Sequence, residues 1–158
     1  GHVNQALGQD YRQTPGAGAA GGVGFAALAL LQAELRPGIE LIMEHVRFEE
    51  LLKSSDLVIT GEGRLDAQSL AGKTPVGIAR AAKRFEIPVV VLAGSLDQGW
   101  QETYAEGVTA AFTLTDRLMK LEQALPRCAE LLADRAESIG RLIQVKLTNL
   151  VESQRVDK

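Results

Sequence analysis

Segment 57–73 concentrates side chains that could bind phosphate together with a metal ion. It reads Leu-Val-Ile-Thr-Gly-Glu-Gly-Arg-Leu-Asp-Ala-Gln-Ser-Leu-Ala-Gly-Lys. The apolar residues 57–59 are typical of a buried parallel strand, and we expect that strand to end in a turn at Thr60-Gly61. Beyond it, two cations lie beside two carboxylates, and two glycines would let the backbone approach a ligand closely. The polar residues of this segment are Glu62, Arg64, Asp66, Gln68, Ser69 and Lys73.

The end of this segment, Gly72-Lys73-Thr74, has the order found at the end of a P-loop. That motif requires a glycine five residues before Gly72, and the position holds Ala67. The predicted strand also lies too far upstream to form the phosphate-binding nest. We therefore exclude a P-loop. Lys73 at a loop-to-helix junction could still contact phosphate, or it could be a solvated lysine.

A second glycine-rich run, Gly16-Ala-Gly18-Ala-Ala-Gly21, has the spacing of a dinucleotide-binding fingerprint. The fingerprint requires a strand immediately before it, and the polar residues 9–15 do not form one. The sequence therefore argues against NAD binding. Two interpretations remain open: the backbone N–H groups of a glycine-rich helix start could hold an anion, or the glycines could permit close helix packing.

The pattern of the chain predicts strands alternating with helices. We expect strands at 56–60, 88–93 and 108–114, and helices at 16–35, 39–46, 48–53, 74–85, 99–105 and 118–150. This alternation predicts an α/β fold with a parallel sheet flanked by helices. Three strands would leave exposed sheet edges, and no strand precedes helix 16–35. We therefore expect the chain to be part of a larger fold.

All three predicted strands lead into polar residues. The carboxyl ends of parallel strands meet at one edge of a sheet, where ligands bind in α/β proteins. Three or four carboxylates at that edge would suit Mg²⁺, although Asp97 and Asp116 taken singly are typical helix caps. The residues after the strands are Glu62, Arg64 and Asp66, then Gly94, Ser95 and Asp97, then Thr115 and Asp116.

Composition narrows the class of protein. The 158 residues are 46% hydrophobic with a net charge of −3, which is typical of a globular domain and argues against a dedicated nucleic-acid surface. One cysteine, Cys128, excludes a disulfide framework, and we expect a buried thiol. The most apolar stretch, 23–31, is too short to cross a bilayer, and no signal peptide is visible, so we expect a cytoplasmic protein.

Several of these runs together resemble the type I glycerate kinases. The runs are 15–22 (Pro-Gly-Ala-Gly-Ala-Ala-Gly-Gly), 34–38 (Glu-Leu-Arg-Pro-Gly), 60–66 (Thr-Gly-Glu-Gly-Arg-Leu-Asp) and 68–75 (Gln-Ser-Leu-Ala-Gly-Lys-Thr-Pro). The family's proteins are longer and have two α/β domains, one inserted into the other. The resemblance implies that this chain is their carboxyl-terminal part. We expect the chain to divide into a polar leader at 1–14, the end of the inserted domain at 15–55, a βαβ domain at 56–150 and a frayed tail at 151–158. Gly1-His2 resembles a residue pair left by removal of a tag.

The resemblance implies an activity, the ATP- and Mg²⁺-dependent phosphorylation of D-glycerate, commonly to 2-phosphoglycerate. Asp66 would be the general base or a magnesium ligand, Glu62 would support the metal, and Arg64 and Lys73 would clamp phosphate or carboxylate. The remaining residues expected to bind substrate or phosphate are Gly61, Gly63, Gln68 and Ser69, and those of an anion-binding loop are Gly16, Gly18, Gly21 and Gly22.

Two alternatives to a kinase remain. The chain could be a non-catalytic α/β domain that self-associates through surfaces left uncovered by truncation, because unpaired sheet edges and apolar faces favour association. The apolar residues that recur at helical spacing in 118–150 could pack on the sheet or serve a partner chain. The chain could also be a small-molecule-binding module without turnover. The partners expected are D-glycerate and ATP, with no nucleic acid and no membrane.

Overall fold

The computed structural model describes residues 10–156, with side chains described through residue 144. The chain forms two compact units, Gly1–Val46 and Arg47–Lys158, which are described separately. The second unit begins before the expected boundary at 55/56 because helix α4 (Phe48–Leu52) packs against α5 (Thr74–Lys83) and buries Leu52. The tag remnant expected at residues 1–2 lies outside the described residues.

The first unit contains a short 3-10 turn, η1 (Ala19–Gly22), followed by helices α2 (Val23–Leu31) and α3 (Gly38–His45). The single helix expected at 16–35 is therefore wrong at both ends. Its start is displaced because Gly16 and Gly22 have φ of 87° and 102°, which no α-helix accommodates. Its end is displaced because Gln32 takes a left-handed conformation. The helix expected at 39–46 is confirmed by α3.

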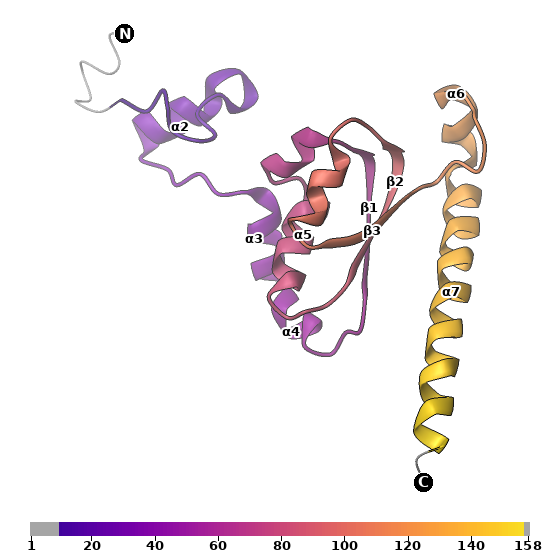
Figure 1. Ribbon diagram of the computed structural model, residues 1–158. Helices are drawn as coiled ribbons and strands as arrows, with labels where there is room; N and C mark the ends of the chain where they lie inside the picture. The colour runs from indigo at the N-terminus through magenta and orange to yellow at the C-terminus, as the bar shows by residue number, and fades with distance from the viewer. Residues whose placement is uncertain (1–9, 157–158) are drawn as a thin grey trace. The chain divides into compact units, whose positions relative to one another are not determined.

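The second unit is built on a three-stranded parallel sheet in the order β1-β2-β3 (Figure 1). The strands are β1 (Val58–Leu65), β2 (Val89–Leu96) and β3 (Val108–Thr113). Helix α5 contacts β1 and β2 on one face. On the other face, Ile139 of α7 (Cys128–Val156) packs against Val90 and Leu92 of β2. The predicted α/β class with a parallel sheet flanked by helices is confirmed.

Strand β1 is longer than its apolar run suggests. The turn expected at Thr60-Gly61 is wrong, because the ladder continues with Glu62 opposite Ala93 and Arg64 opposite Ser95. The extension ends at Leu65, which is fully buried and anchors the strand. The residues that sequence reasoning assigned to a turn are therefore held on a strand, with the positional precision that a strand provides.

Short elements connect the strands, and the final helix is interrupted. They are η2 (Ala67–Ala71), η3 (Trp100–Tyr104), α6 (Leu121–Ala124) and η4 (Leu125–Arg127). The residues expected to be helical at 118–150 form α6, η4 and α7. Pro126 lies in η4, directly before α7 begins, where its missing N–H costs nothing. Helix α7 continues to Val156, into the segment expected to fray. Among the described helices, none has the length and apolarity that crossing a bilayer demands.

Candidate active site

The centre of the candidate site is Asp66, the residue at which the chain leaves β1. Its extended backbone places it as the N-cap of η2, where its carboxylate accepts a hydrogen bond of 3.0 Å from the Ser69 backbone N–H. In return, the Asp66 N–H donates to the Ser69 hydroxyl oxygen at 3.1 Å, and that hydroxyl lies 3.1 Å from Asp66 Oδ1. This reciprocal capping box fixes the carboxylate. Ser69 is fully buried and its side chain positions Asp66, while its expected contact with substrate stays a prediction.

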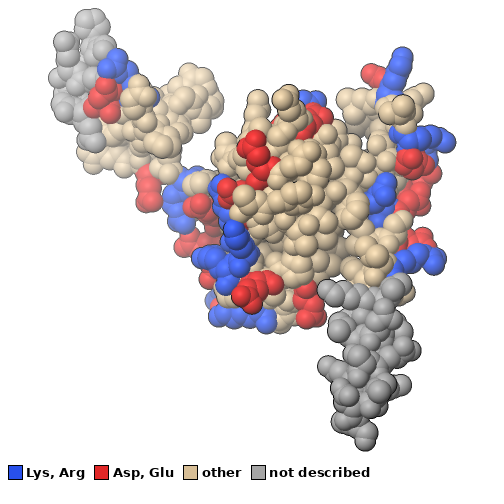
Figure 2. All heavy atoms as spheres, viewed as in Figure 1, with Lys and Arg blue, Asp and Glu red and all other residues tan. Residues whose placement is uncertain are grey.

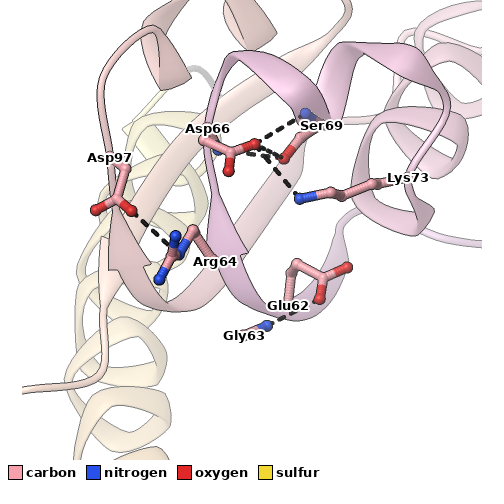
Figure 3. Close-up of polar contacts among 7 residues, drawn as sticks. All are labelled: Glu62, Gly63, Arg64, Asp66, Ser69, Lys73 and Asp97. Atoms are coloured by element: carbon pink, nitrogen blue, oxygen red, sulfur yellow. Dashed lines mark hydrogen bonds and ion pairs between the residues drawn. The ribbon is translucent and has the colours of Figure 1, made fainter. Parts of the chain in front are cut away.

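Lys73 completes this group at the start of α5. Its Nζ lies 3.4 Å from Asp66 Oδ1 (Figure 3). Partial burial raises the pKa of Asp66, but the hydrogen bonds from Ser69 and Lys73 and the Lys73 charge outweigh it and hold the pKa below its usual value. Asp66 is therefore an ionised carboxylate at neutral pH, as a cation ligand must be.

A second pair lies where β1 and β2 end side by side. Arg64 Nε is 3.1 Å from Asp97 Oδ2, and the Asp97 N–H donates to the Leu65 carbonyl at 2.8 Å. The expectation that the carboxyl ends of these strands meet is thereby confirmed.

The helix-cap interpretation of Asp97 is wrong, because Gly99 is the N-cap of η3. That of Asp116 is also wrong, because Lys120 is the N-cap of α6.

The carboxylates do not converge on one point. Within residues 10–156, no group of three His, Cys, Asp or Glu side chains could hold a metal ion, so the expected cluster of three or four carboxylates is wrong. Each carboxylate has its own partner: Asp66 has Ser69 and Lys73, Asp97 has Arg64, and Glu62 accepts from the Gly63 N–H at 3.0 Å (Figure 3). Mg²⁺ in kinases takes only one or two protein carboxylates, with phosphates and water supplying the rest, and these residues fit that requirement.

A cavity of about 610 Å³ adjoins the same strand ends on the face covered by α6 and α7. Sequence reasoning missed it because its walls come from elements far apart in the chain. Cys128, at the start of α7, lines this cavity. Its thiol was expected to be buried, and that expectation is wrong because Cys128 is exposed. The cavity is lined by Gly61, Glu62, Gly63, Arg64, Leu92, Gly94, Ser95, Leu114, Thr115, Leu121, Ala124, Leu125, Cys128, Leu131 and Leu132.

The glycine-rich run belongs to the first unit and leads into α2. A Cβ on Gly24 would lie 2.1 Å from the Gly16 carbonyl oxygen, so this glycine is required for packing inside the unit. By contrast, a Cβ on Gly18, Gly21 or Gly22 would meet nothing within 4 Å. The packing interpretation therefore explains Gly24, and the other three glycines leave open space at the amino end of α2. Gln68, the remaining expected site residue, is exposed on η2.

Charged side chains of both signs are interspersed elsewhere on the surface (Figure 2). Arg80 and Lys83 of α5 are exposed, as is Arg84 directly after it, and each has a partner. Arg80 pairs with Glu106 at 2.5 Å, and Lys83 donates to the Ala105 carbonyl at 2.7 Å. These contacts join α5 to the turn before β3, so the cations of α5 support the fold.

Comparison with known proteins gives consistent matches. A family model described as the glycerate kinase family matches residues 1–144. The chain is 46% identical over 138 residues to a glycerate kinase of Halalkalibacterium halodurans, which covers 87% of this chain and 36% of that protein. It is 37% identical over 147 residues to the glycerate 2-kinase of Escherichia coli, covering 93% of this chain and 39% of that protein.

A solved structure gives the same result. It is the crystal structure of a Salmonella typhimurium LT2 protein assigned as a glycerate kinase 2, which matches with a TM-score of 0.67 and 36% identity. The match covers 92% of this chain and 37% of that one. This chain thus spans well under half the length of the relatives it matches. By its sequence and its fold, it belongs to the glycerate kinase family.

Proposed function

We propose that this chain is the carboxyl-terminal part of an enzyme that transfers the γ-phosphoryl group of ATP to D-glycerate. The observation that carries the proposal is the Asp66–Lys73 group, fixed by Ser69 at the carboxyl end of a parallel strand in a chain of this family. Phosphoryl transfer needs little covalent chemistry from the protein, so positioning and charge neutralisation are the main requirements. A fixed carboxylate beside an ammonium group supplies both.

In this proposal the cationic side chains bind the anionic groups of the substrates, and the carboxylates bind a cation. Lys73 and Arg64 neutralise phosphate or the glycerate carboxylate, and Arg64 is available because exposed pairs such as Arg64–Asp97 are weak. Asp66 was expected to be either the general base or a magnesium ligand. Its lowered pKa makes it a weak proton acceptor and a good cation ligand, which favours the second role.

Magnesium belongs to this proposal as an ion that bridges nucleotide phosphates and offsets their charge. Asp66 would hold it, with Glu62 of β1 as the second carboxylate. The glycine-rich loop of the first unit is proposed to bind a further anionic group through its backbone N–H groups, with Gly16, Gly18, Gly21 and Gly22 as its residues. Gly61, Gly63 and Gln68 border the same strand end and are proposed to contact substrate.

The position of phosphorylation is proposed to be the 2-hydroxyl of glycerate. Support comes from the Escherichia coli relative, whose name is glycerate 2-kinase. We further place the activity in the cytoplasm, where ATP is available to a kinase and where a free thiol such as that of Cys128 stays reduced.

The test is release of ADP in the presence of ATP, Mg²⁺ and D-glycerate. It uses the 158-residue chain and a chain extended at the amino end to the length of its relatives. Glycerate-dependent release by either chain, with the new phosphoryl group on C2 by NMR, supports the proposal. Release only by the extended chain assigns the remaining site groups to the added residues. Absence of glycerate-dependent release from both chains contradicts the kinase function.

One observation favours the self-association alternative. Several leucines of the α6–α7 region are more than half exposed, and Ile59 on the edge strand β1 is 50% exposed. Apolar patches of this kind often mark interaction sites. Concentration-dependent light scattering by a chain without turnover would favour this alternative, whereas a monomer at all concentrations would exclude it. The leucines are Leu118, Leu121, Leu125 and Leu142.

A further inference from the structure

The cavity beside β1 has a size and lining suited to a small molecule. Its volume of about 610 Å³ falls inside the range of roughly 300–1,000 Å³ that is usual for small-molecule sites. Such sites are mostly apolar, with a few polar groups that fix orientation. We infer that this cavity holds the nucleoside part of the ATP substrate, an inference that rests on the proposed kinase function.

The floor of the cavity is glycine backbone. Gly61, Gly63 and Gly94 line it from the ends of β1 and β2. A Cβ on Gly63 would meet nothing within 4 Å, so the space above this residue is open. A Cβ on Gly94 would lie 2.6 Å from the Gly63 carbonyl oxygen, so a side chain there cannot be accommodated without moving the strands. A floor without side chains allows a flat aromatic ring to approach the sheet closely.

The walls of the cavity supply apolar surface. Leu121 and Leu125 are 67% and 63% exposed and line it from the α6–η4 segment. Covering them with a purine ring would remove apolar area from water, which is the main source of favourable free energy in such sites. Ser95 and Thr115 lie at the ends of β2 and β3 and also line the cavity, and their hydroxyls can bond the polar edge of a base.

One cation lines the cavity at the end of β1. Arg64 lines the cavity and belongs to the same strand end as Asp66. A nucleotide has an apolar ring at one end and anionic phosphates at the other, so it matches both the leucine walls and the cation. An apolar segment of another protein chain would fill the walls but leave the Arg64 cation unused. The charge pattern therefore favours a nucleotide as the occupant.

Cys128 provides a direct measurement, because it is the chain's single cysteine, it is exposed and it lines the cavity. We would measure the rate at which iodoacetamide alkylates it, with adenosine, ATP or inorganic tripolyphosphate present. At a ligand concentration ten times the Kd, the free fraction falls about 11-fold, so adenosine and ATP should slow alkylation by about tenfold. Tripolyphosphate should not. Protection by tripolyphosphate alone, or by none of the three, would overturn the inference.

A matched pair of variants tests the apolar wall. Leu125→Asp places a carboxylate in the wall, and the Kd for adenosine should rise roughly tenfold or more because the charge must be desolvated. Leu142→Asp changes a similarly exposed leucine of α7 that does not line the cavity, and its Kd should match wild type. Equal Kd values for both variants would place adenosine elsewhere.

Two outcomes separate this inference from the kinase proposal. Protection of Cys128 by adenosine without phosphoryl transfer would leave the nucleoside site standing and remove the proposed function. Glycerate-dependent ADP release, with Cys128 alkylated equally fast with and without saturating ATP, would support the kinase function and remove the nucleoside site from this cavity. A third outcome, Cys128 protected in the extended chain without nucleotide, would show that another segment of that chain fills the cavity and would overturn the inference.

Discussion

At the scale of single residues, hydrogen bonding determines which polar side chains act together. Asp66, Ser69 and Lys73 form one group because a capping box and an ion pair join them. Arg64 is only two residues from Asp66, yet it pairs with Asp97 of the neighbouring strand. The sequence places four of these residues within 64–73, and the predicted parallel sheet places Asp97 at the same edge, but neither shows which carboxylate each cation contacts.

Ser69 should be important for stability, because its buried hydroxyl completes the capping box with Asp66. Ser69→Ala removes the side-chain half of the capping box, and we expect it to lower the free energy of unfolding by about 1 kcal/mol in urea titrations. Ser138→Ala, an exposed serine on α7, is the matched control and should stay within about 0.5 kcal/mol of wild type. Similar losses in the two variants would contradict the positioning role.

Glu106, in the turn before β3, forms an ion pair with Arg80 of α5, and the contribution of this pair to stability should depend on pH. The hydrogen bond and charge of Arg80 lower the pKa of Glu106, with a smaller opposing effect of burial. A carboxylate with a lowered pKa contributes stability above the ordinary value of 4.5, and that contribution disappears as the pH falls through the lowered value. The stability difference between wild type and Glu106→Gln should therefore be largest at neutral pH and shrink below about 4.5.

This comparison requires thermal unfolding curves from about pH 7 to about pH 3. Glu102→Gln, an exposed glutamate of η3, is the control for simple loss of charge. A difference between wild type and Glu106→Gln that stays constant across the whole range would show that the Arg80 contact contributes nothing to folding.

At the scale of elements, the close approach of β1 and β2 shapes both the polar site and the cavity. Glycine at 94 permits that approach, because a Cβ would collide with the Gly63 carbonyl oxygen at 2.6 Å. We expect Gly94→Ala to destabilise the second unit by about 1–3 kcal/mol in urea titrations. Gly63→Ala, whose Cβ enters open space, should change stability by less than about 0.5 kcal/mol. Equal effects would contradict the packing.

The sequence predicted elements better than their ends. Helices at 39–46, 48–53 and 74–85 and the three strands all occur, because hydrophobic period and proline positions decide them locally. The end of β1 was misplaced because Gly61-Glu62-Gly63 looks like a turn in isolation. Pairing with β2 and burial of Leu65 keep it extended, and both are tertiary effects that the local sequence does not contain.

The candidate site was predicted in part. Chemically active side chains cluster at residues 62–73 in the sequence, and the structure brings Asp66, Ser69 and Lys73 together, while their roles stay predictions. The expected cluster of three or four carboxylates is wrong among the described residues, because each carboxylate contacts a partner of its own. The cavity could not be predicted, since its glycine floor and leucine walls are brought together only by α7 packing on the sheet. One signal was available: glycine at alternate positions 61 and 63 leaves one face of β1 without side chains.

At the scale of the whole molecule, the chain spans 36% and 39% of the lengths of two glycerate kinases that it matches. Its three-stranded sheet has open edges, and we propose that residues beyond this chain complete the site. The central claim is that the carboxyl end of β1 brings an essential carboxylate to that site. The claim is independent of how the remaining groups are supplied.

The most direct test is the turnover of Asp66→Asn in the extended chain, measured as glycerate-dependent ADP release. The substitution keeps the shape of the side chain but removes the charge that holds a cation. Because a bound metal supplies several kcal/mol of charge stabilisation, kcat should fall by about 10²-fold or more. Asp116→Asn, at the end of β3 beside Arg117, is the matched control and should turn over like wild type. Wild-type turnover by Asp66→Asn, or an equal loss in both variants, would contradict the account.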